Sequence, residues 1–208
     1  MSQYFQIHPE TPQPRLVRRT GEVLRQGGVI VYPTDSTYAL ACCMGEKEAI
    51  DRIRELRQLG ATHQFTLACR DLSDIGVYAR VDNNTFRLLK SHTPGPFTFV
   101  LPATSEVPRR LQHPKRKSIG IRVPDHRVAQ AILSELGEPL ISTSLLLPGE
   151  ELPPTDAELI RERLGSRVEA VVDGGAGGLE PSTVVDLTGD SPAVIRRGAG
   201  DAALFEGG

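Results

Sequence analysis

The sequence predicts a protein in which helices cover a mixed, twisted β-sheet. Three observations lead to this expectation. Segments with the spacing of amphipathic helices alternate with short apolar runs rich in β-branched residues. Extra strand-like runs follow near the C-terminal end. The turns between segments are short, and none has the composition of a flexible linker. The pattern suits an α/β or an α+β protein; we expect α/β, with residues 1–208 forming a single domain.

The N-terminal half alternates helix and strand. Asp71 and Asp82 each precede a short helical pattern and are expected to be N-caps, because aspartate accepts hydrogen bonds from the free N–H groups of a first turn. The glycine pair Gly27–Gly28 closes the first helix. The predicted segments of this half are helices at 15–26 and 46–57, short helices after Asp71 and Asp82, and strands at 29–32, 65–69 and 97–101.

The C-terminal half is richer in strands. Gly137 ends one predicted helix, and the pattern Thr155-Asp156-Ala157-Glu158 is typical of a capping box that starts another. The run 174–178 is glycine-rich and is expected to be a tight turn rather than a phosphate loop. The predicted segments are strands at 118–123, 140–147, 168–172, 182–187 and 193–196, and helices at 128–136 and from 155 onward.

The stretch 27–40 is the one around which we expect the chain to be organised. An apolar run typical of a strand buried on both faces ends at Pro33, which has no N–H to continue a ladder. Thr34, Asp35, Ser36 and Thr37 follow directly. Ligands of open α/β sheets lie outside the carboxyl ends of strands, so these side chains could form the floor of a site. They are equally typical of an ordinary turn.

Composition excludes several classes of protein. The net charge of −2 does not indicate a general nucleic-acid binder, so any such role must come from local clustering. The three cysteines, Cys42, Cys43 and Cys69, form no C-x-x-C pair, which favours reduced thiols in the cytoplasm. There is no signal-peptide core, and no apolar run approaches the ~18 residues of a membrane span.

Several catalytic motifs are missing from the sequence. There is no Walker loop, no G-x-G-x-x-G and no G-x-S-x-G elbow. The five histidines do not have the spacing of metal ligands, so no protein-bound metal is expected. A conventional hydrolase or zinc enzyme is therefore disfavoured.

Hydroxyl groups and arginines near strand ends remain as candidate ligands. Arginine forks and hydroxyl donors suit a phosphate or a carboxylate. Arg122 is the most informative, because it interrupts an apolar strand and its charge needs an anionic partner. That partner could be a ligand or a structural carboxylate. The group comprises Thr34, Ser36, Thr98, Ser118, Thr143, Ser144, Ser182, Thr183, Arg57, Arg122, Arg196 and Arg197.

Five motifs in order resemble those of the YrdC-like family, most closely its YciO branch, over residues 29–197. They are Pro33–Tyr38, Thr93–Thr98, Ile121–Pro124, Thr143–Ser144 and Ser182–Asp186. The resemblance implies a twisted, open, mixed sheet of the YrdC/RibB-like class, with a positively charged concave face that binds nucleotides or RNA. The best-known members make threonylcarbamoyladenylate from threonine, bicarbonate and ATP, for modification of tRNA at adenosine 37.

The resemblance also implies roles for individual residues. Arg57 and Arg122 match catalytic positions, and Mg²⁺ would arrive with ATP. The positions that match a threonine site are Thr34, Ser36, Arg122 and Ser182. The positions that match a nucleotide site are Ser118, Ser142, Ser144 and Arg196.

The chain departs from the active branch of the family at three places. Lys-x-Arg is replaced by Arg57-Gln58-Leu59, Ser-x-Asn by Ser144-Leu145-Leu146, and a histidine on the following strand by Cys69. Losing one preorganised transition-state group costs roughly 10²–10³ in rate. We therefore expect a retained cleft with weak synthesis or a different substrate.

The alternative is a non-catalytic protein that binds double-stranded RNA, tRNA or rRNA. Basic side chains on one face bind phosphates without reading sequence. A solvated surface loop would explain the same cluster. The residues concerned are Arg109, Arg110, Lys115, Arg116 and Lys117.

Overall fold

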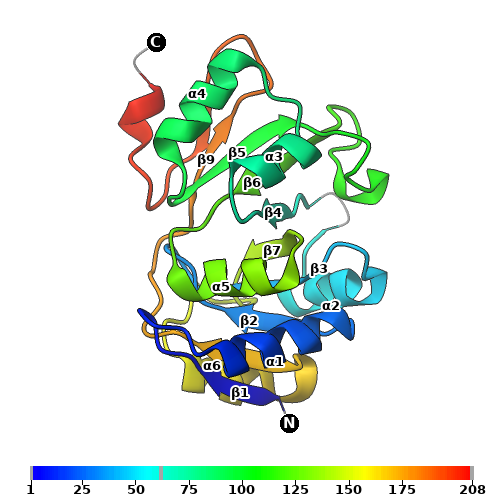
Figure 1. The fold of residues 1–208 in the computed structure, drawn as a ribbon, viewed down its shortest axis with the longest axis vertical. Helices are drawn as coiled ribbons and strands as arrows, with labels where there is room; N and C mark the ends of the chain where they lie inside the picture. Colours follow the sequence, from blue (N-terminus) through cyan, green and yellow to red (C-terminus); the bar gives the residue numbers. More distant parts are fainter. Residues whose placement is uncertain (1, 61–62, 207–208) are drawn as a thin grey trace.

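The computed structural model describes residues 2–60 and 63–206. Its strands form one sheet in the order β1-β8-β2-β3-β7-β4-β6-β5-β9-β10, with parallel and antiparallel pairs mixed (Figure 1). The two edge strands place the N- and C-termini at opposite ends of the molecule. The strands are β1 (Gln3–Gln6), β2 (Ile30–Tyr32), β3 (Ala39–Cys43), β4 (Thr66–Ala68), β5 (Phe97–Pro102), β6 (Ser118–Arg122), β7 (Leu140–Ser144), β8 (Ala170–Asp173), β9 (Thr183–Asp186) and β10 (Ala193–Arg196).

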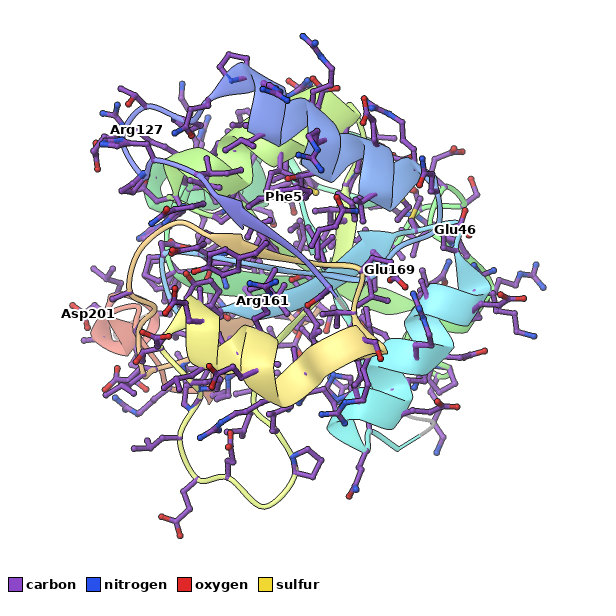
Figure 2. The ribbon with its side chains drawn as sticks, turned by 90° about the horizontal axis from the view of Figure 1, so that it is seen from below. Phe5, Glu46, Arg127, Arg161, Glu169 and Asp201 are labelled. Atoms are coloured by element: carbon purple, nitrogen blue, oxygen red, sulfur yellow. The ribbon has the colours of Figure 1, made fainter. Side chains whose placement is uncertain are left out.

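Helices pack on both faces of the sheet. Looking along the molecule from its β1 end, α1 and α5 lie on one side of the strands, and α2 and α6 on the other (Figure 2). Val31 of β2 packs in the core under α2 and α6, whereas its neighbour Tyr32 packs in the core under α1 and α5. The helices are α1 (Pro14–Arg25), α2 (Lys47–Arg57), α3 (Leu72–Tyr78), α4 (Asn83–His92), α5 (Arg127–Leu136) and α6 (Ala157–Leu164), with 3₁₀ turns at Arg109–Leu111, Gly165–Arg167 and Ala202–Phe205.

The predicted α/β architecture and most predicted elements are confirmed. Asp71 caps α3 by accepting from the N–H groups of Ser73 and Asp74, and Asp82 caps α4 by accepting from that of Thr85. No helix among the described residues is long and apolar enough to cross a membrane.

Three details of the sequence prediction are wrong. Asp156, not Thr155, caps α6, because its carboxylate accepts from the Leu159 N–H. The strand expected at 140–147 ends at Ser144, where the chain turns and the Leu145 N–H bonds the Tyr38 carbonyl. Strands β1 and β3 were not predicted at all.

The cover of α1 and α5 extends over only part of their face of the sheet. The apolar core beneath these two helices is built from β1, β8, β2 and β3 and ends at Leu140 of β7 and Ala68 of β4. No described residue of β6, β5, β9 or β10 belongs to this apolar core. This half of the face is therefore left for polar side chains.

Candidate functional site

A cleft of about 320 Å³ lies over the uncovered half of the sheet. Its floor is a row of small side chains, since Thr66 pairs with both Ser142 and Gly120, and Gly120 pairs with Val100. Residues directly opposite one another on neighbouring strands point to the same face. Four adjacent strands thus contribute a shallow floor at this point.

Three arginines from three separate elements line the cleft: Arg57 at the end of α2, Arg122 at the end of β6 and Arg196 at the end of β10. The chain folds them together because β6, β5, β9 and β10 are consecutive in the sheet. None of the described residues that line the cleft is Asp or Glu. The cleft is therefore strongly cationic.

Arg122 is held from behind by the loop that follows β2. One terminal nitrogen donates to the Ser36 hydroxyl at 3.0 Å, and the other pairs with the Asp35 carboxylate. Thr34 bonds Ser36 and the Thr37 carbonyl, which fixes the loop. The sequence left a ligand and a structural carboxylate open as the partner of Arg122; the structure contains the structural pair, and the Arg122 Nε–H has no partner among the described residues.

Among the described residues, Arg196 and Arg57 bond only neutral groups. The Arg196 guanidinium donates to the Ser182 carbonyl at 2.7 Å and to its hydroxyl at 3.2 Å, and that hydroxyl lies 2.7 Å from the Thr98 hydroxyl. Arg57 donates to the Ser144 carbonyl and lies 3.4 Å from the Thr143 hydroxyl. Both guanidiniums are thus oriented without being neutralised.

The charges of this cluster act on one another. Burial and the charge of Arg196 lower the pKa of Arg57, and burial and the charge of Arg122 lower the pKa of Arg196. Arginine keeps its proton in proteins, so the cleft stays cationic at neutral pH. Burial, followed by the charges of Arg57, Arg54 and Arg196, lowers the pKa of His63 at the rim of the cleft. The imidazole is therefore neutral at pH 7 and offers one donor and one acceptor.

The arrangement suits a ligand with several negative charges and an apolar part. Fixed guanidinium forks and hydroxyl donors bind phosphate and carboxylate oxygens. Val184 and Ile195 supply apolar surface to the same cleft, and Ile195 is 60% exposed. A nucleotide has this combination of groups.

The structure brings most of the predicted site residues together. Thr34 and Ser36 are buried and support Arg122 rather than line the cleft. Ser118 lies at the opposite end of β6 from Arg122, buried and outside the lining. Thr183 and Arg197 also lie outside the lining. The predicted residues that line the cleft are Arg57, Thr98, Arg122, Ser142, Thr143, Ser144, Ser182 and Arg196.

Sequence reasoning missed other residues of the lining. His63 was set aside with the scattered histidines, and Gln64 carried no motif. Thr66 could have been found, because strand alternation places it on the face opposite to Leu67. Val184 and Ile195 were not singled out because an isolated apolar residue in a strand carries no functional signal.

The glycine-rich run after β8 is a turn, as predicted. Gly175 has φ +100°, which favours glycine. A Cβ on Gly178 would lie 2.0 Å from the Ser36 carbonyl oxygen. The second half of the run therefore packs directly against the loop that supports Arg122.

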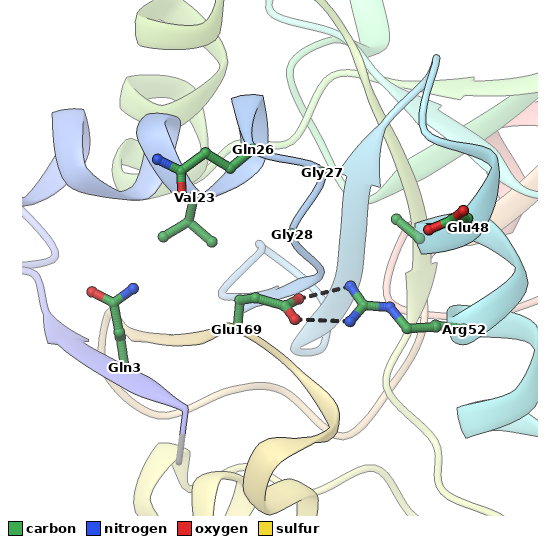
Figure 3. Close-up of a pocket in the computed structure, with 9 residues that line it drawn as sticks. Gln3, Val23, Gln26, Gly27, Gly28, Glu48, Arg52 and Glu169 are labelled. Carbon is green, nitrogen blue, oxygen red and sulfur yellow. Dashed lines mark hydrogen bonds and ion pairs between the residues drawn. The ribbon is translucent and has the colours of Figure 1, made fainter.

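Another pocket, of about 340 Å³, lies between α1 and α2 (Figure 3). Its arginine, Arg52, forms two hydrogen bonds of 2.8 Å with Glu169, whose carboxylate also accepts from the Val29 N–H at 2.6 Å. Burial opposes ionisation of Glu169, but the bonds from Arg52 and Val29 outweigh it and lower the pKa. These groups already satisfy one another and join α2 to the sheet, so they form a structural link.

The basic residues predicted to bind RNA lie on the loop between β5 and β6, away from the cleft lining. Arg110 donates to the Met44 and Gly45 carbonyls, and Arg116 pairs with Asp186 at 2.9 Å. The loop is therefore attached to its surroundings and is more ordered than a freely solvated segment.

The cysteines are buried and unpaired, as expected from their number. Cys42 and Cys43 point to opposite faces of the sheet and belong to different apolar cores. Burial raises the pKa of each of these two thiols to about 12. Neither thiol has the low pKa of a nucleophile.

Comparison with known proteins adds a family to this geometry. A Sua5/YciO/YrdC family model, described as telomere recombination, matches residues 22–198. The uncharacterised protein YciO of Escherichia coli is 54% identical over 205 residues, which cover 99% of this chain and all of that protein. Its crystal structure has a TM-score of 0.95, with 99% of this chain and 100% of that chain covered.

More distant relatives carry a functional name. The threonylcarbamoyl-AMP synthase of Halorhodospira halophila is 33% identical over 190 residues, covering 91% of this chain and 98% of the synthase. The crystal structure of P. abyssi Sua5 complexed with L-threonine is 26% identical, with a TM-score of 0.85, over 94% of this chain and 57% of that one.

Proposed function

The chain belongs to the Sua5/YciO/YrdC family, and we propose that it is a weak or divergent threonylcarbamoyl-AMP synthase. The reaction joins threonine, bicarbonate and ATP into threonylcarbamoyl-AMP and releases pyrophosphate and water, to supply tRNA modification at adenosine 37. The observation that carries the proposal is the cleft itself. It holds three fixed guanidiniums with no carboxylate in its described lining, beside an apolar wall.

Each group of the cleft has a role in this proposal. Arg122 binds the amino-acid carboxylate through the N–H groups that Asp35 and Ser36 leave free. The threonine amine and bicarbonate first form the carbamate with release of water; a carbamate oxygen then attacks the α-phosphorus of ATP, and the bond to pyrophosphate breaks. Arg57 and Arg196 stabilise the charge on the phosphate oxygens, while Ser142, Ser144 and Ser182 orient the substrates. Mg²⁺ enters as part of the MgATP substrate; the described lining of the cleft holds no carboxylate.

Two departures from the active branch support a low rate or another substrate. Leu59 packs against the apolar core on the α2 face and supplies no second cation. Leu146 follows the turn at the end of β7, where the active branch has an amide. The free, buried cysteines are consistent with work in a reducing compartment, and we place the protein in the cytoplasm.

A mass-spectrometric assay tests the proposal. The protein is incubated with MgATP, threonine and bicarbonate, and threonylcarbamoyl-AMP and pyrophosphate are measured beside an active relative. We expect product at a rate about 10²-fold or more below that of the relative. No product with any of the proteinogenic amino acids, although ATP still binds, would refute catalysis and leave a binding function.

A second candidate function is binding of double-stranded RNA or tRNA by the basic loop. The observation in its favour is that the loop gathers exposed cations on a segment anchored by Arg110 and Arg116. Binding of an RNA duplex titrated with salt tests it, because affinity that comes from phosphate contacts falls steeply as salt rises. Negligible binding at low salt would exclude this function.

A further inference from the structure

We propose that the loop between β5 and β6 forms a second binding site, specific for phosphoryl groups and separate from the cleft. The proposal does not depend on the synthase activity. Its basis is a hollow of about 570 Å³ between this loop and the segment that follows α3. The volume lies within the roughly 300–1,000 Å³ range of small-molecule sites.

Four cationic side chains line this hollow: Arg80, Arg109, Arg116 and Lys117. Arg116 pairs with Asp186, but the other three have no ion-pair partner in residues 2–60 and 63–206. None of the described residues in the lining is Asp or Glu. The described lining of the hollow therefore carries an excess of positive charge.

The backbone of the loop is held in place before any ligand arrives. The Lys117 N–H donates to the His113 carbonyl at 2.9 Å, and the Lys117 carbonyl accepts from the Ala103 N–H at 2.9 Å. The Gln112 amide donates to the Val107 carbonyl at 2.7 Å. A preorganised loop loses less conformational entropy on binding than a mobile one.

Two features of this backbone point to a ligand. Lys117 has φ +50°, a left-handed conformation that is uncommon for residues other than glycine and clusters at functional sites. The His113 Nδ1 accepts from the N–H groups of Lys115 and Arg116 at 3.2 and 3.1 Å. In the neutral ring the proton is then on Nε2, so His113 adds a donor to a hollow that already has four cations.

A phosphoryl group is the anion that best matches this set. It presents three oxygens and up to two charges, whereas a carboxylate presents two oxygens and one charge. Arginine forks bind phosphate in two-bond geometry, and lysine binds it as a point charge. The source is either a small phosphorylated molecule or the phosphodiester backbone of RNA.

The hollow lies at one end of β5 and β6, whereas the cleft extends from the other end of these strands to Val100 and Gly120 in their middle. Pro102 of β5 and Lys117, which precedes β6, line the hollow, whereas Thr98 and Arg122 line the cleft. Four residues of a strand span about 13 Å. The two sites can therefore be perturbed separately.

Titration of ¹⁵N-labelled protein with inorganic pyrophosphate, followed by amide NMR, tests the proposal. We expect saturable shifts at residues 103–117, weakened when salt is raised to about 0.15 M because exposed charges are then screened. The double variant Arg109→Ala/Lys117→Asn should weaken this response about tenfold or more. Asparagine is chosen because it tolerates the left-handed backbone at position 117.

Two controls make the outcome decisive. Arg15→Ala/Arg18→Ala removes two exposed charges from α1 and should leave the loop response unchanged. Arg57→Ala/Arg196→Ala should abolish shifts in the cleft and spare those of the loop, so failure of the synthase proposal stays distinguishable from failure of this one. Shifts in residues 103–117 that never saturate, or that persist in Arg109→Ala/Lys117→Asn, would overturn the proposal.

A competition experiment identifies the source of the phosphoryl group. If an RNA duplex displaces pyrophosphate from the loop residues, the natural ligand is a phosphodiester backbone. If pyrophosphate saturates the loop and RNA does not displace it, the ligand is a small phosphorylated molecule. If neither probe shifts these residues, the site does not exist.

Discussion

Replacing Arg122 by alanine should destabilise the whole protein as well as weaken ligand binding. In the structure, Arg122 and Asp35 form an ion pair whose side chains are only 7% and 11% exposed. The substitution therefore leaves a buried carboxylate without its cation.

The size of the effect follows from the bonds that are lost. Arg122 makes two hydrogen bonds, to Asp35 and to Ser36. Hydrogen bonds that involve a charged group contribute about 1.5–3 kcal/mol each, and breaking a buried ion pair from one side costs about 3–5 kcal/mol. We take about 3–5 kcal/mol, a large part of the ~5–15 kcal/mol that stabilises a typical domain. In a domain of this size, that loss lowers the melting temperature by roughly 6–20 °C.

Urea unfolding measures this loss of stability. It is followed by far-UV circular dichroism, because the protein has no tryptophan whose fluorescence could report unfolding. The double variant Asp35→Ala/Arg122→Ala is the control. This double variant also removes the buried Asp35 carboxylate that would otherwise have no cation, so it should be more stable than Arg122→Ala alone. A loss below about 1 kcal/mol in Arg122→Ala, or a double variant less stable than the single one, would refute the reasoning.

Three further predictions concern the cleft arginine Arg196, the structural Arg52–Glu169 pair and the departure at Leu146. Arg196→Ala should lower the ATP affinity measured by calorimetry about tenfold. Its stability should change by only about 1 kcal/mol, because the bonds of Arg196 among the described residues go to neutral groups of Ser182. An unchanged ATP affinity would show that Arg196 is not part of the site. Glu169→Gln should be less stable than the unmodified protein in thermal unfolding at pH 7, and this difference should disappear as the pH falls below the ordinary carboxyl pKa of 4.5. The reason is that the pKa of Glu169 is lowered in the folded state, so the group stabilises the fold only while it is ionised. A difference in stability that does not depend on pH would contradict this. Leu146→Asn should raise the rate of threonylcarbamoyl-AMP synthesis about tenfold or more in the mass-spectrometric assay, because it restores the amide that the active branch has two residues after the cleft residue Ser144. An unchanged rate would show that this loss does not limit synthesis.

Local patterns in the sequence were enough for the helices, the caps of α3 and α4 and most strands. α2, for example, has its apolar residues on one face, and Asp71 and Asp82 precede their helices as caps. Strands β1 and β3 escaped because their identity depends on distant partners. β1 pairs in register with β8, where Gln3 lies opposite Ala170, and β3 has five buried residues in a row with no alternation to mark it.

The sequence by itself determined the family, through five motifs in order, and the residue types of the cleft, because arginine and serine at strand ends are visible in one dimension. Only the tertiary structure decided what those residues do. Thr34 and Ser36 lie outside the cleft lining and support Arg122 instead of facing a ligand. Arg122 pairs with Asp35, whereas Arg57 and Arg196 have no carboxylate beside them in the described lining. The reason is physical. Burial and charge pairing depend on which half of a sheet face the helices leave uncovered, and that is set by contacts between segments far apart in the chain.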